Sequence, residues 1–332
     1  MKTAIIGAGT WGTALSRAIA LKTEEVTVWT CIPEEAERLT RERAHWNLPG
    51  MTVPGNVSFT TDGEEAVRGA EFIIVAVPSV YVRQTMSTFR EQIQGNPVII
   101  CASKGIESST LLTLTGVIRD ELRPEESKAS RIAAISGPTH AEEVARDMPT
   151  LLVAASENLE TAAKVQQLFE NTCIRAYTNT DLLGVEICGA LKNVEALAVG
   201  IAAGLGYGDN TRAALITRGM EEIRRLGLAM GCAERTFFGL AGIGDLIVTA
   251  TSMHSRNNRA GILIGKGKGV REAVKEVGMV VEGINALPAA TALCRKYGMD
   301  MPLIQAVHEI VENDAKPDEI VRDLMNRKLR ME

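Results

Sequence analysis

The sequence predicts an α/β fold with a mostly parallel sheet, followed by an all-α region. Three observations lead to this prediction. A glycine-rich segment directly follows the first apolar run, short apolar runs alternate with helix-like segments over the first 180 residues, and long helical patterns replace them from about Asp181. Alternation of strands with helices implies a parallel sheet that is covered by helices on both faces. We therefore expect two domains, residues 1–180 and residues 181–332.

The expected strands of the first domain are short apolar runs: Thr3–Ile6, Val26–Trp29, Val57–Thr60, Phe72–Val77, Val98–Ala102, Ile132–Ser136, Thr150–Ala154 and Cys173–Thr178. Helix-like segments separate most of them, as at Pro33–Arg43, Ser79–Gln92 and Leu111–Leu122. The helices expected in the second domain are Asp181–Ala203, Thr211–Met230, Val270–Glu276, Ala286–Tyr297, Leu303–Glu312 and Asp318–Asn326. Because no low-complexity linker separates the domains, we expect them to pack together with a functional site between them.

The glycine-rich segment has the pattern G-x-G-x-x-G, formed by Gly7, Gly9 and Gly12 between a strand and a helix. The first glycine allows a sharp turn, the second lets the backbone approach a pyrophosphate, and the third lets the helix pack closely on the strand. The N-terminal amides and the dipole of the helix favour the phosphates. This pattern predicts a Rossmann-like domain that binds a dinucleotide. The alternative is a tight strand-to-helix turn without a ligand.

The composition is ordinary for a globular protein. Of the 332 residues, 45% are hydrophobic and 23% are charged. A net charge of -5 argues against a general nucleic-acid surface. The cysteines form no C-x-x-C motif and have no histidine at metal-ligand spacing, so we expect reduced thiols and no metal site. The chain enters a strand too early for a signal peptide and has no apolar run near the roughly 18 residues of a membrane span, so we expect a cytoplasmic protein outside the membrane.

The end of the second expected strand leaves the choice between NAD and NADP open. Sites for NAD usually place Asp or Glu about 20 residues after the glycines, where the acid binds the ribose 2′-hydroxyl. Here Trp29 is followed by Thr30, Cys31 and Ile32. This stretch has no acid that would repel a 2′-phosphate and no arginine that would bind it.

Two further loops follow expected strands. Lys104 comes after the fifth strand, where a lysine is well placed to meet an anion, although a solvated surface lysine is the alternative. After the sixth strand, Gly137 and the start of a helix can present amides to a substrate or a cofactor. Thr139 and Glu142 in the same loop also match a capping box, which would explain the motif by structure alone.

A lysine in the second domain is the candidate acid and base. On a helix, one face combines Lys192 with small or apolar residues, namely Gly184, Cys188, Ala196 and Val199. Such surroundings desolvate an ammonium group and lower its pKa towards the range of a general acid or base. The alternative is a lysine that covers apolar surface with its stem while its charge stays in water.

Two polar clusters complete the candidates in the second domain. Asp245 follows a glycine-rich apolar segment and leads to Thr249. Ser255, Arg256 and Asn257 open a helix, where a hydroxyl, a guanidinium, an amide and free helical N–H groups suit a phosphate. A polar helix start without a ligand is the alternative.

Taken with these residues, the chain resembles the bacterial-type NAD(P)-dependent glycerol-3-phosphate dehydrogenases from end to end. The segments that carry the resemblance are Gly7-Ala8-Gly9-Thr10-Trp11-Gly12-Thr13-Ala14-Leu15, Ser103-Lys104-Gly105, Ser136-Gly137-Pro138-Thr139-His140-Ala141, Leu191-Lys192-Asn193-Val194, Gly242-Ile243-Gly244-Asp245-Leu246, Ser255-Arg256-Asn257 and Val280-Val281-Glu282-Gly283. The resemblance implies a reversible hydride transfer between NAD or NADP and a small phosphorylated substrate, in a homodimer that supplies glycerol 3-phosphate for glycerophospholipid synthesis.

The resemblance also implies roles for individual residues. Lys192 is the proton donor and acceptor, with Lys104, Asp245 and Thr249 assisting. The residues implied to contact the substrate are Lys104, Gly137, Thr139, Lys192, Asp245, Ser255, Arg256 and Asn257. Those implied to contact the nucleotide, beside the three glycines, are Thr10, Trp11, Lys104, Ala141, Arg256, Val280 and Glu282.

Two stretches depart from the family pattern. The family commonly continues after Trp29 with Gly-His-Arg or similar, so the usual basic contact to a 2′-phosphate is missing here. The family also tends to place an aromatic residue directly before Leu48, where this chain has Asn47 preceded by Trp46. Two rival hypotheses remain: a two-domain dehydrogenase that acts on another 2-hydroxy compound, and a nucleotide-binding module without turnover.

Overall fold

The computed structural model describes residues 1–122 and 131–328, and the chain folds into two compact units. The first unit contains Met1–Lys104 and Leu112–Glu186, and the second contains Gly105–Leu111 and Ile187–Glu332. The division falls inside helix α9 (Leu182–Gly204), which begins next to the expected domain boundary at residue 180. A short segment from the first half of the chain therefore belongs to the second unit.

The first unit is built on one eight-stranded sheet with the order β3-β2-β1-β4-β5-β6-β7-β8. Its strands are β1 (Lys2–Ile6), β2 (Glu25–Trp29), β3 (Val57–Thr60), β4 (Phe72–Val75), β5 (Val98–Cys101), β6 (Ile132–Ser136), β7 (Thr150–Ala155) and β8 (Ile174–Asn179). All neighbouring strands are parallel except β6 and β7, which are antiparallel. The prediction of an α/β fold with a mostly parallel sheet is confirmed, and each strand lies within two residues of its expected range.

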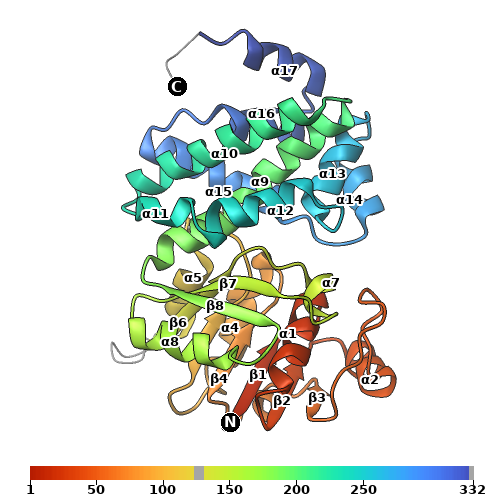
Figure 1. The fold of residues 1–332 in the computed structure, drawn as a ribbon, viewed down its shortest axis with the longest axis vertical. Coiled ribbons are helices and arrows are strands. Elements are labelled where there is room, and N and C mark those ends of the chain that lie inside the picture. Colours follow the sequence, from red (N-terminus) through yellow and green to blue (C-terminus); the bar gives the residue numbers. More distant parts are fainter. Residues whose placement is uncertain (123–130, 329–332) are drawn as a thin grey trace. The chain divides into compact units, whose positions relative to one another are not determined.

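Helices cover this sheet (Figure 1). They are α1 (Thr10–Ala20), α2 (Pro33–Glu42), α3 (Gly63–Val67), η1 (Ser79–Tyr81), α4 (Val82–Phe89), α5 (Leu114–Leu122), α7 (Ala141–Val144) and α8 (Leu159–Leu168). Ile5 and Ile74 from the strands pack in one buried cluster with Leu15 of α1 and Val165 of α8. Helix α5 begins three residues later than expected because Leu111 has a φ of 60°, which a right-handed helix cannot include.

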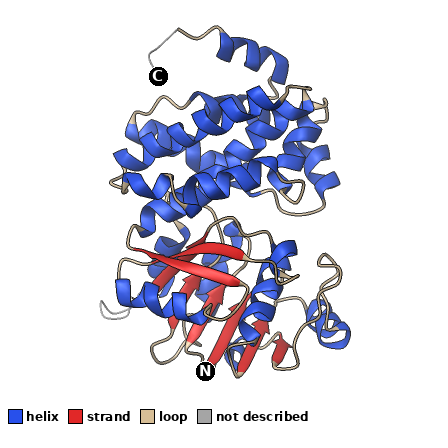
Figure 2. Cartoon of the chain, viewed as in Figure 1, coloured by secondary structure: helices blue, strands red, loops and turns tan. Residues whose placement is uncertain are grey.

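The described part of the second unit is helical (Figure 2). Besides α9, it contains α10 (Asp209–Ala229), α11 (Glu234–Phe237), η2 (Leu240–Gly244), α12 (Asp245–Thr251), α13 (Arg256–Gly265), α14 (Val270–Val277), α15 (Glu282–Tyr297), α16 (Pro302–Glu312) and α17 (Pro317–Met325). The all-α character predicted for this region is confirmed. No single described helix has both the length and the apolar character to cross a membrane, whereas the pair Glu234–Thr251 and Arg256–Gly265, bent by 48°, passes that test together.

Small residues bring α9 and α13 into backbone contact. A Cβ atom at Gly200 of α9 would lie 2.3 Å from the carbonyl oxygen of Asn258, and a Cβ at Gly261 of α13 would lie 2.3 Å from that of Leu197. Only glycine fits at these positions, because real Cβ atoms do not approach other atoms so closely. This close packing fixes the start of α13 against the helix that carries Lys192.

Candidate active site

The turn after β1 has the geometry that the glycine pattern predicts. Gly7 has a φ of 118°, and its N–H donates a 2.9 Å hydrogen bond to the carbonyl oxygen of Trp29. A Cβ at Gly7 would lie 2.7 Å from the oxygen of Ala76, and a Cβ at Gly12 would lie 2.0 Å from the oxygen of Gly7. Glycine is therefore required at both positions by the packing of the protein itself.

Gly9 is different, because no neighbour among the described residues requires a glycine there. It is exposed, it precedes α1 in an extended conformation, and a Cβ at this position would meet no atom within 4 Å. No side chain caps this helix start, and Thr10 and Trp11 in the first turn are half-buried. An open glycine beside helical N–H groups fits the close approach of a dinucleotide pyrophosphate.

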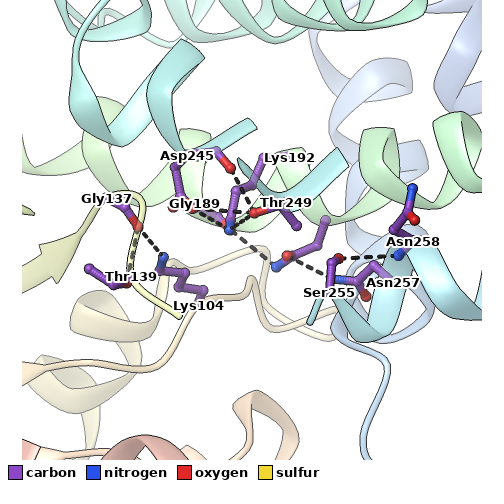
Figure 3. Close-up of polar contacts among 11 residues, drawn as sticks. Lys104, Gly137, Thr139, Gly189, Lys192, Asp245, Thr249, Ser255, Asn257 and Asn258 are labelled. Carbon is purple, nitrogen blue, oxygen red and sulfur yellow. Dashed lines mark hydrogen bonds and ion pairs between the residues drawn. The ribbon is translucent and has the colours of Figure 1, made fainter. Parts of the chain in front are cut away.

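Lys104 and the loop after β6 meet at one carbonyl group. The Lys104 Nζ donates a 3.2 Å hydrogen bond to the oxygen of Gly137, and the Thr139 hydroxyl donates a 3.0 Å bond to the same oxygen (Figure 3). Gly137 has a φ of 147°, which favours glycine. The loop therefore holds the lysine and the threonine side by side at the end of a strand.

The capping box expected from Thr139 and Glu142 is wrong. Helix α7 has His140 as its N-cap residue, without a side-chain cap, and Ala141 is its first residue. The Thr139 hydroxyl does not cap the helix because it bonds to the carbonyl oxygen of Gly137 two residues earlier. Ala141 is buried in the core cluster that also contains residues of α1.

Lys192 is the centre of a buried polar cluster in the second unit. Its Nζ lies 2.5 Å from Asp245 Oδ1 and 2.6 Å from Thr249 Oγ1 (Figure 3). The side chain of Lys192 is 7% exposed and that of Asp245 is 1% exposed. The hydroxyl of Thr249 also donates a 2.6 Å bond to the main-chain oxygen of Asp245. These contacts fix both the position of the ammonium group and the direction of its N–H bonds.

Two opposing effects act on the charge of Lys192. Burial disfavours an ammonium group, whereas an adjacent carboxylate favours it. The interpretation of Lys192 as a lysine whose charge stays in water is wrong for this structure, since its side chain is buried among partners. Its partners come from α12, whose first residue is Asp245. Asp245 lies in the first turn of α12, where the helix dipole favours a negative charge.

The segment before α12 explains how Asp245 reaches this position. Gly242 has non-helical backbone angles, and a Cβ there would lie 2.1 Å from the oxygen of Phe237. The backbone of this turn thus packs directly on the end of α11. Close packing of the glycine-rich turn aims the first residue of α12 at the Lys192 amine.

The expected phosphate cluster at the start of α13 is partly engaged in the fold. Ser255 is the N-cap of α13, and its hydroxyl accepts a 3.2 Å bond from the N–H of Asn258. The amide of Asn257 donates to Asn193 Oδ1 at 2.9 Å and accepts from the N–H of Gly283 at 2.8 Å. Both side chains are buried. Arg256, the first residue of the helix, is half-buried.

Asn257 also bonds to the start of α15, the segment of the second unit that is expected to contact the nucleotide. Gly283 lies in the first turn of α15, which begins at Glu282, and Val280 precedes that helix. Val280 and Glu282 are half-buried. Through Asn257, the starts of α13 and α15 are tied to α9 one residue after Lys192.

Sequence reasoning missed two groups. Asn193, whose amide donates to the Gly189 oxygen at 3.2 Å and whose oxygen accepts from Asn257, links the lysine helix to α13. Glu35 lies in the first turn of α2, and the Thr30 hydroxyl donates a hydrogen bond to its carboxylate. An acid therefore does lie at the end of β2, although it comes from five residues further along.

Among residues 1–122 and 131–328, no three His, Cys, Asp or Glu side chains are placed to hold a metal ion.

Comparison with known proteins decides the family. Residues 2–162 match the model of the NAD-dependent glycerol-3-phosphate dehydrogenase N-terminus, and residues 181–322 match that of the C-terminus. A protein from Lactobacillus delbrueckii subspecies bulgaricus, glycerol-3-phosphate dehydrogenase (NAD(P)+) 2, is 55% identical over 332 residues, with 100% of this chain and 98% of the relative covered. The chain belongs to the NAD-dependent glycerol-3-phosphate dehydrogenase family.

Other members agree over the same length. The glycerol-3-phosphate dehydrogenase (NAD(P)+) of Agathobacter rectalis is 47% identical, over 99% of this chain and 96% of its own. A crystal structure of glycerol-3-phosphate dehydrogenase from Coxiella burnetii superposes with a TM-score of 0.92 at 34% identity, covering 98% of this chain and 99% of the other. The resemblance that the sequence motifs indicated is thereby confirmed, and with it membership of a family of NAD(P)-dependent oxidoreductases.

Proposed function

We propose that this chain interconverts dihydroxyacetone phosphate and sn-glycerol 3-phosphate with NAD(H) or NADP(H) as the second substrate. The observation that carries the proposal is the buried Lys192, held by Asp245 and Thr249 in a member of this dehydrogenase family. An enzyme that reduces a ketone needs a proton donor at the carbonyl oxygen, and an ordered ammonium group supplies one. A module that only binds nucleotide has no use for such a group.

The nucleotide would be held by the glycine turn, which contacts the pyrophosphate, and by the further residues that the family resemblance implies. The set comprises Gly7, Gly9, Thr10, Trp11, Gly12, Lys104, Ala141, Arg256, Val280 and Glu282. The open position at Gly9 supports the fit, since a side chain there would occupy the space next to the first turn of α1. When bound, the nicotinamide supplies or accepts the hydride at C2 of the substrate.

Lys192 would move the proton. In the reductive direction its Nζ donates a proton to the substrate oxygen at C2, and the resulting amine is protonated again from solvent. In the oxidative direction the neutral amine accepts the proton of the C2 hydroxyl. Asp245 and Thr249 fix the Nζ through hydrogen bonds of 2.5 and 2.6 Å. The lysine side chain is therefore already held in one conformation when the proton is transferred. Lys104 would add positive charge that stabilises the developing oxyanion.

Substrate binding would use Arg256 for the phosphate and the first turn of α13 for additional N–H groups. Gly137, Thr139, Ser255 and Asn257 complete the proposed contact set. Because the side chains of Ser255 and Asn257 already bond within the fold, their contribution is to hold the start of α13 in place. Binding of the remote phosphate then orients the carbonyl that reacts.

The wider assignments belong to the same proposal. Residues 1–180 would act as the dinucleotide-binding domain and residues 181–332 as the substrate-binding and catalytic domain. The protein would work in the cytoplasm as a homodimer, outside the membrane and without nucleic acid, and its product would feed glycerophospholipid synthesis. Size-exclusion chromatography with light scattering tests the homodimer.

A spectrophotometric assay tests the reaction. Purified protein is mixed with NADH or NADPH and with dihydroxyacetone phosphate, and absorbance at the reduced nicotinamide band is followed. We expect oxidation with the phosphorylated ketone and little with unphosphorylated dihydroxyacetone. Faster turnover of another 2-hydroxy compound and its ketone would instead indicate a dehydrogenase with a different substrate. No oxidation of either nucleotide with any ketone would indicate a binding module.

A further inference from the structure

The end of β2 lies beside the glycine turn. Strands β1 and β2 are parallel with Ile6 opposite Trp29, and the N–H of Gly7 bonds to the oxygen of Trp29 at 2.9 Å. The next residue, Thr30, is buried, and its N–H donates a 3.1 Å bond to the oxygen of Thr60 at the end of β3. In dinucleotide-binding domains this strand end faces the adenosine ribose, where an acid binds the 2′-hydroxyl of NAD or an arginine accommodates the 2′-phosphate of NADP.

An acid is fastened at this strand end although the strand itself contains none there. The hydroxyl of Thr30 accepts a 3.3 Å bond from the N–H of Ile32 and donates its proton to Glu35. Because the hydroxyl has one proton, the N–H of Ile32 and the carboxylate of Glu35 together fix its direction. Glu35 is half-buried in the first turn of α2, where the helix dipole stabilises a negative charge.

The basic residues near this strand end have other contacts. Arg38 Nε lies 2.9 Å from Glu42, and its guanidinium lies over the ring of Trp46 at 4.6 Å. Arg41 lies 3.2 Å from the same Glu42. These two arginines belong to the later part of α2, whereas its first turn carries only acidic charge, Glu34 and Glu35. The charge that a 2′-phosphate would meet first is therefore negative.

We propose that Glu35, positioned by Thr30, makes this chain select NAD(H) over NADP(H). The inference rests on the proposed function, because it assigns the nucleotide specificity of that same site. The carboxylate would accept hydrogen bonds from the ribose hydroxyls of NAD(H). A 2′-phosphate at the same place carries up to two negative charges and no proton to donate, so it would be repelled. Glu35 is thus the specificity residue that the departure from the family pattern at Thr30-Cys31-Ile32 left unassigned.

Steady-state kinetics with both nucleotides test the proposal. For the unaltered chain we expect kcat/KM for NADH to exceed that for NADPH by about tenfold or more, a factor that corresponds to about 1.4 kcal/mol. Glu35→Gln keeps the size of the side chain and removes its charge, so the ratio should fall by about tenfold, mainly through a gain with NADPH. Glu34→Gln removes the same charge from an exposed neighbour on the same turn and is the matched control, with an unchanged ratio.

A binding measurement provides a readout that does not depend on turnover. Calorimetric titration with 5′-AMP and with 2′,5′-ADP compares a ribose with and without the 2′-phosphate. The unaltered chain should bind 5′-AMP more tightly, and Glu35→Gln should reduce that difference. Thr30→Val, which keeps Glu35 but removes the hydroxyl that positions it, should reduce the difference in the same direction.

The outcomes separate the two proposals. Preference for NADPH and 2′,5′-ADP in the unaltered chain overturns the role of Glu35, as does a ratio that Glu35→Gln and Glu34→Gln change equally. If the chain oxidises neither nucleotide, the proposed function fails, while the two calorimetric titrations of the unaltered chain still decide the inference. If Glu35→Gln does not fold, the calorimetric titrations of the unaltered chain and of Thr30→Val decide the inference about Glu35.

Discussion

Removing the Lys192 side chain tests both its chemistry and its electrostatics. Lys192→Met keeps a side chain of similar length but removes the ammonium group that lies 2.5 Å from Asp245. Asp245 is 1% exposed, so its carboxylate would stay buried without an opposite charge. Breaking a buried ion pair by removing one partner costs about 3–5 kcal/mol. We therefore expect the free energy of unfolding of Lys192→Met to fall by roughly that amount.

A second substitution separates stability from catalysis. Asp245→Asn in the Lys192→Met background removes the uncompensated charge and retains an oxygen that can accept from Thr249. We expect the double variant to regain more than about half of the lost stability, because replacing both partners of a buried pair is often nearly neutral. It should not regain activity. In both variants kcat should fall by about 10²-fold or more, the scale of general acid-base catalysis.

The assay combines urea unfolding, followed by tryptophan fluorescence, with NADH oxidation at saturating dihydroxyacetone phosphate. Nucleotide affinity, measured by titration, should change little in either variant. Turnover close to that of the unaltered chain in Lys192→Met would refute its role as proton donor. A double variant that is no more stable than Lys192→Met would refute the argument from buried charge.

Three further predictions concern other parts of the chain. Burial raises the pKa of Glu222 from 4.5 to about 7, so this acid contributes stability that is present below pH 4.5 and is lost as the pH rises to about 7. Its contribution to the free energy of unfolding should fall by about 3 kcal/mol over that range. Burial and the charge of Glu222 also raise the pKa of Glu195, which adds a slope of the same sign, so Glu222→Gln should reduce the slope measured in urea titrations without abolishing it. Gly9→Ala should lower the free energy of unfolding by less than about 1 kcal/mol while weakening nucleotide binding. Gly12→Ala should prevent stable folding, because its Cβ would lie 2.0 Å from the oxygen of Gly7. Equal effects of the two substitutions on stability would contradict the ligand role of Gly9. Arg256→Ala should reduce kcat/KM for dihydroxyacetone phosphate by about 10- to 10²-fold, the loss expected for a hydrogen bond to a charged group, with little effect on dihydroxyacetone. Arg259→Ala on the same helix is the control, and equal losses on both ketones would exclude a phosphate contact.

Local patterns predicted the glycine turn and the start of α13 well. Gly7 and Gly12 are demanded by backbone conformation and packing within a single strand-turn-helix unit, and such local requirements are written in adjacent residues. Ser255, expected at the opening of a helix, is the N-cap of α13. The capping box expected at Thr139 does not form, because the Thr139 hydroxyl bonds instead to the carbonyl oxygen of Gly137. The spacing of residues alone does not reveal this competing acceptor.

Contacts between distant segments could not be predicted from pattern. Lys192 was identified from its helix face, but its partner Asp245 is 53 residues away and arrives through the close packing at Gly242. Glu35 could not be assigned for a related reason. The strand end itself contains no acid, and only the turn of the chain at Ile32 lets the first turn of α2 bring a carboxylate back to Thr30. Both cases depend on where a backbone turn aims a side chain.

Isotope transfer follows the hydride from the nucleotide to C2 of the substrate. The protein is incubated with NADH carrying deuterium on the transferred C4 position and with dihydroxyacetone phosphate in ordinary water, and the product is analysed by mass spectrometry and NMR. We expect sn-glycerol 3-phosphate with one deuterium at C2, formed by the unaltered chain and formed at least about 10²-fold more slowly by Lys192→Met. Product without deuterium at C2, or the same rate of formation in the variant, would contradict this expectation.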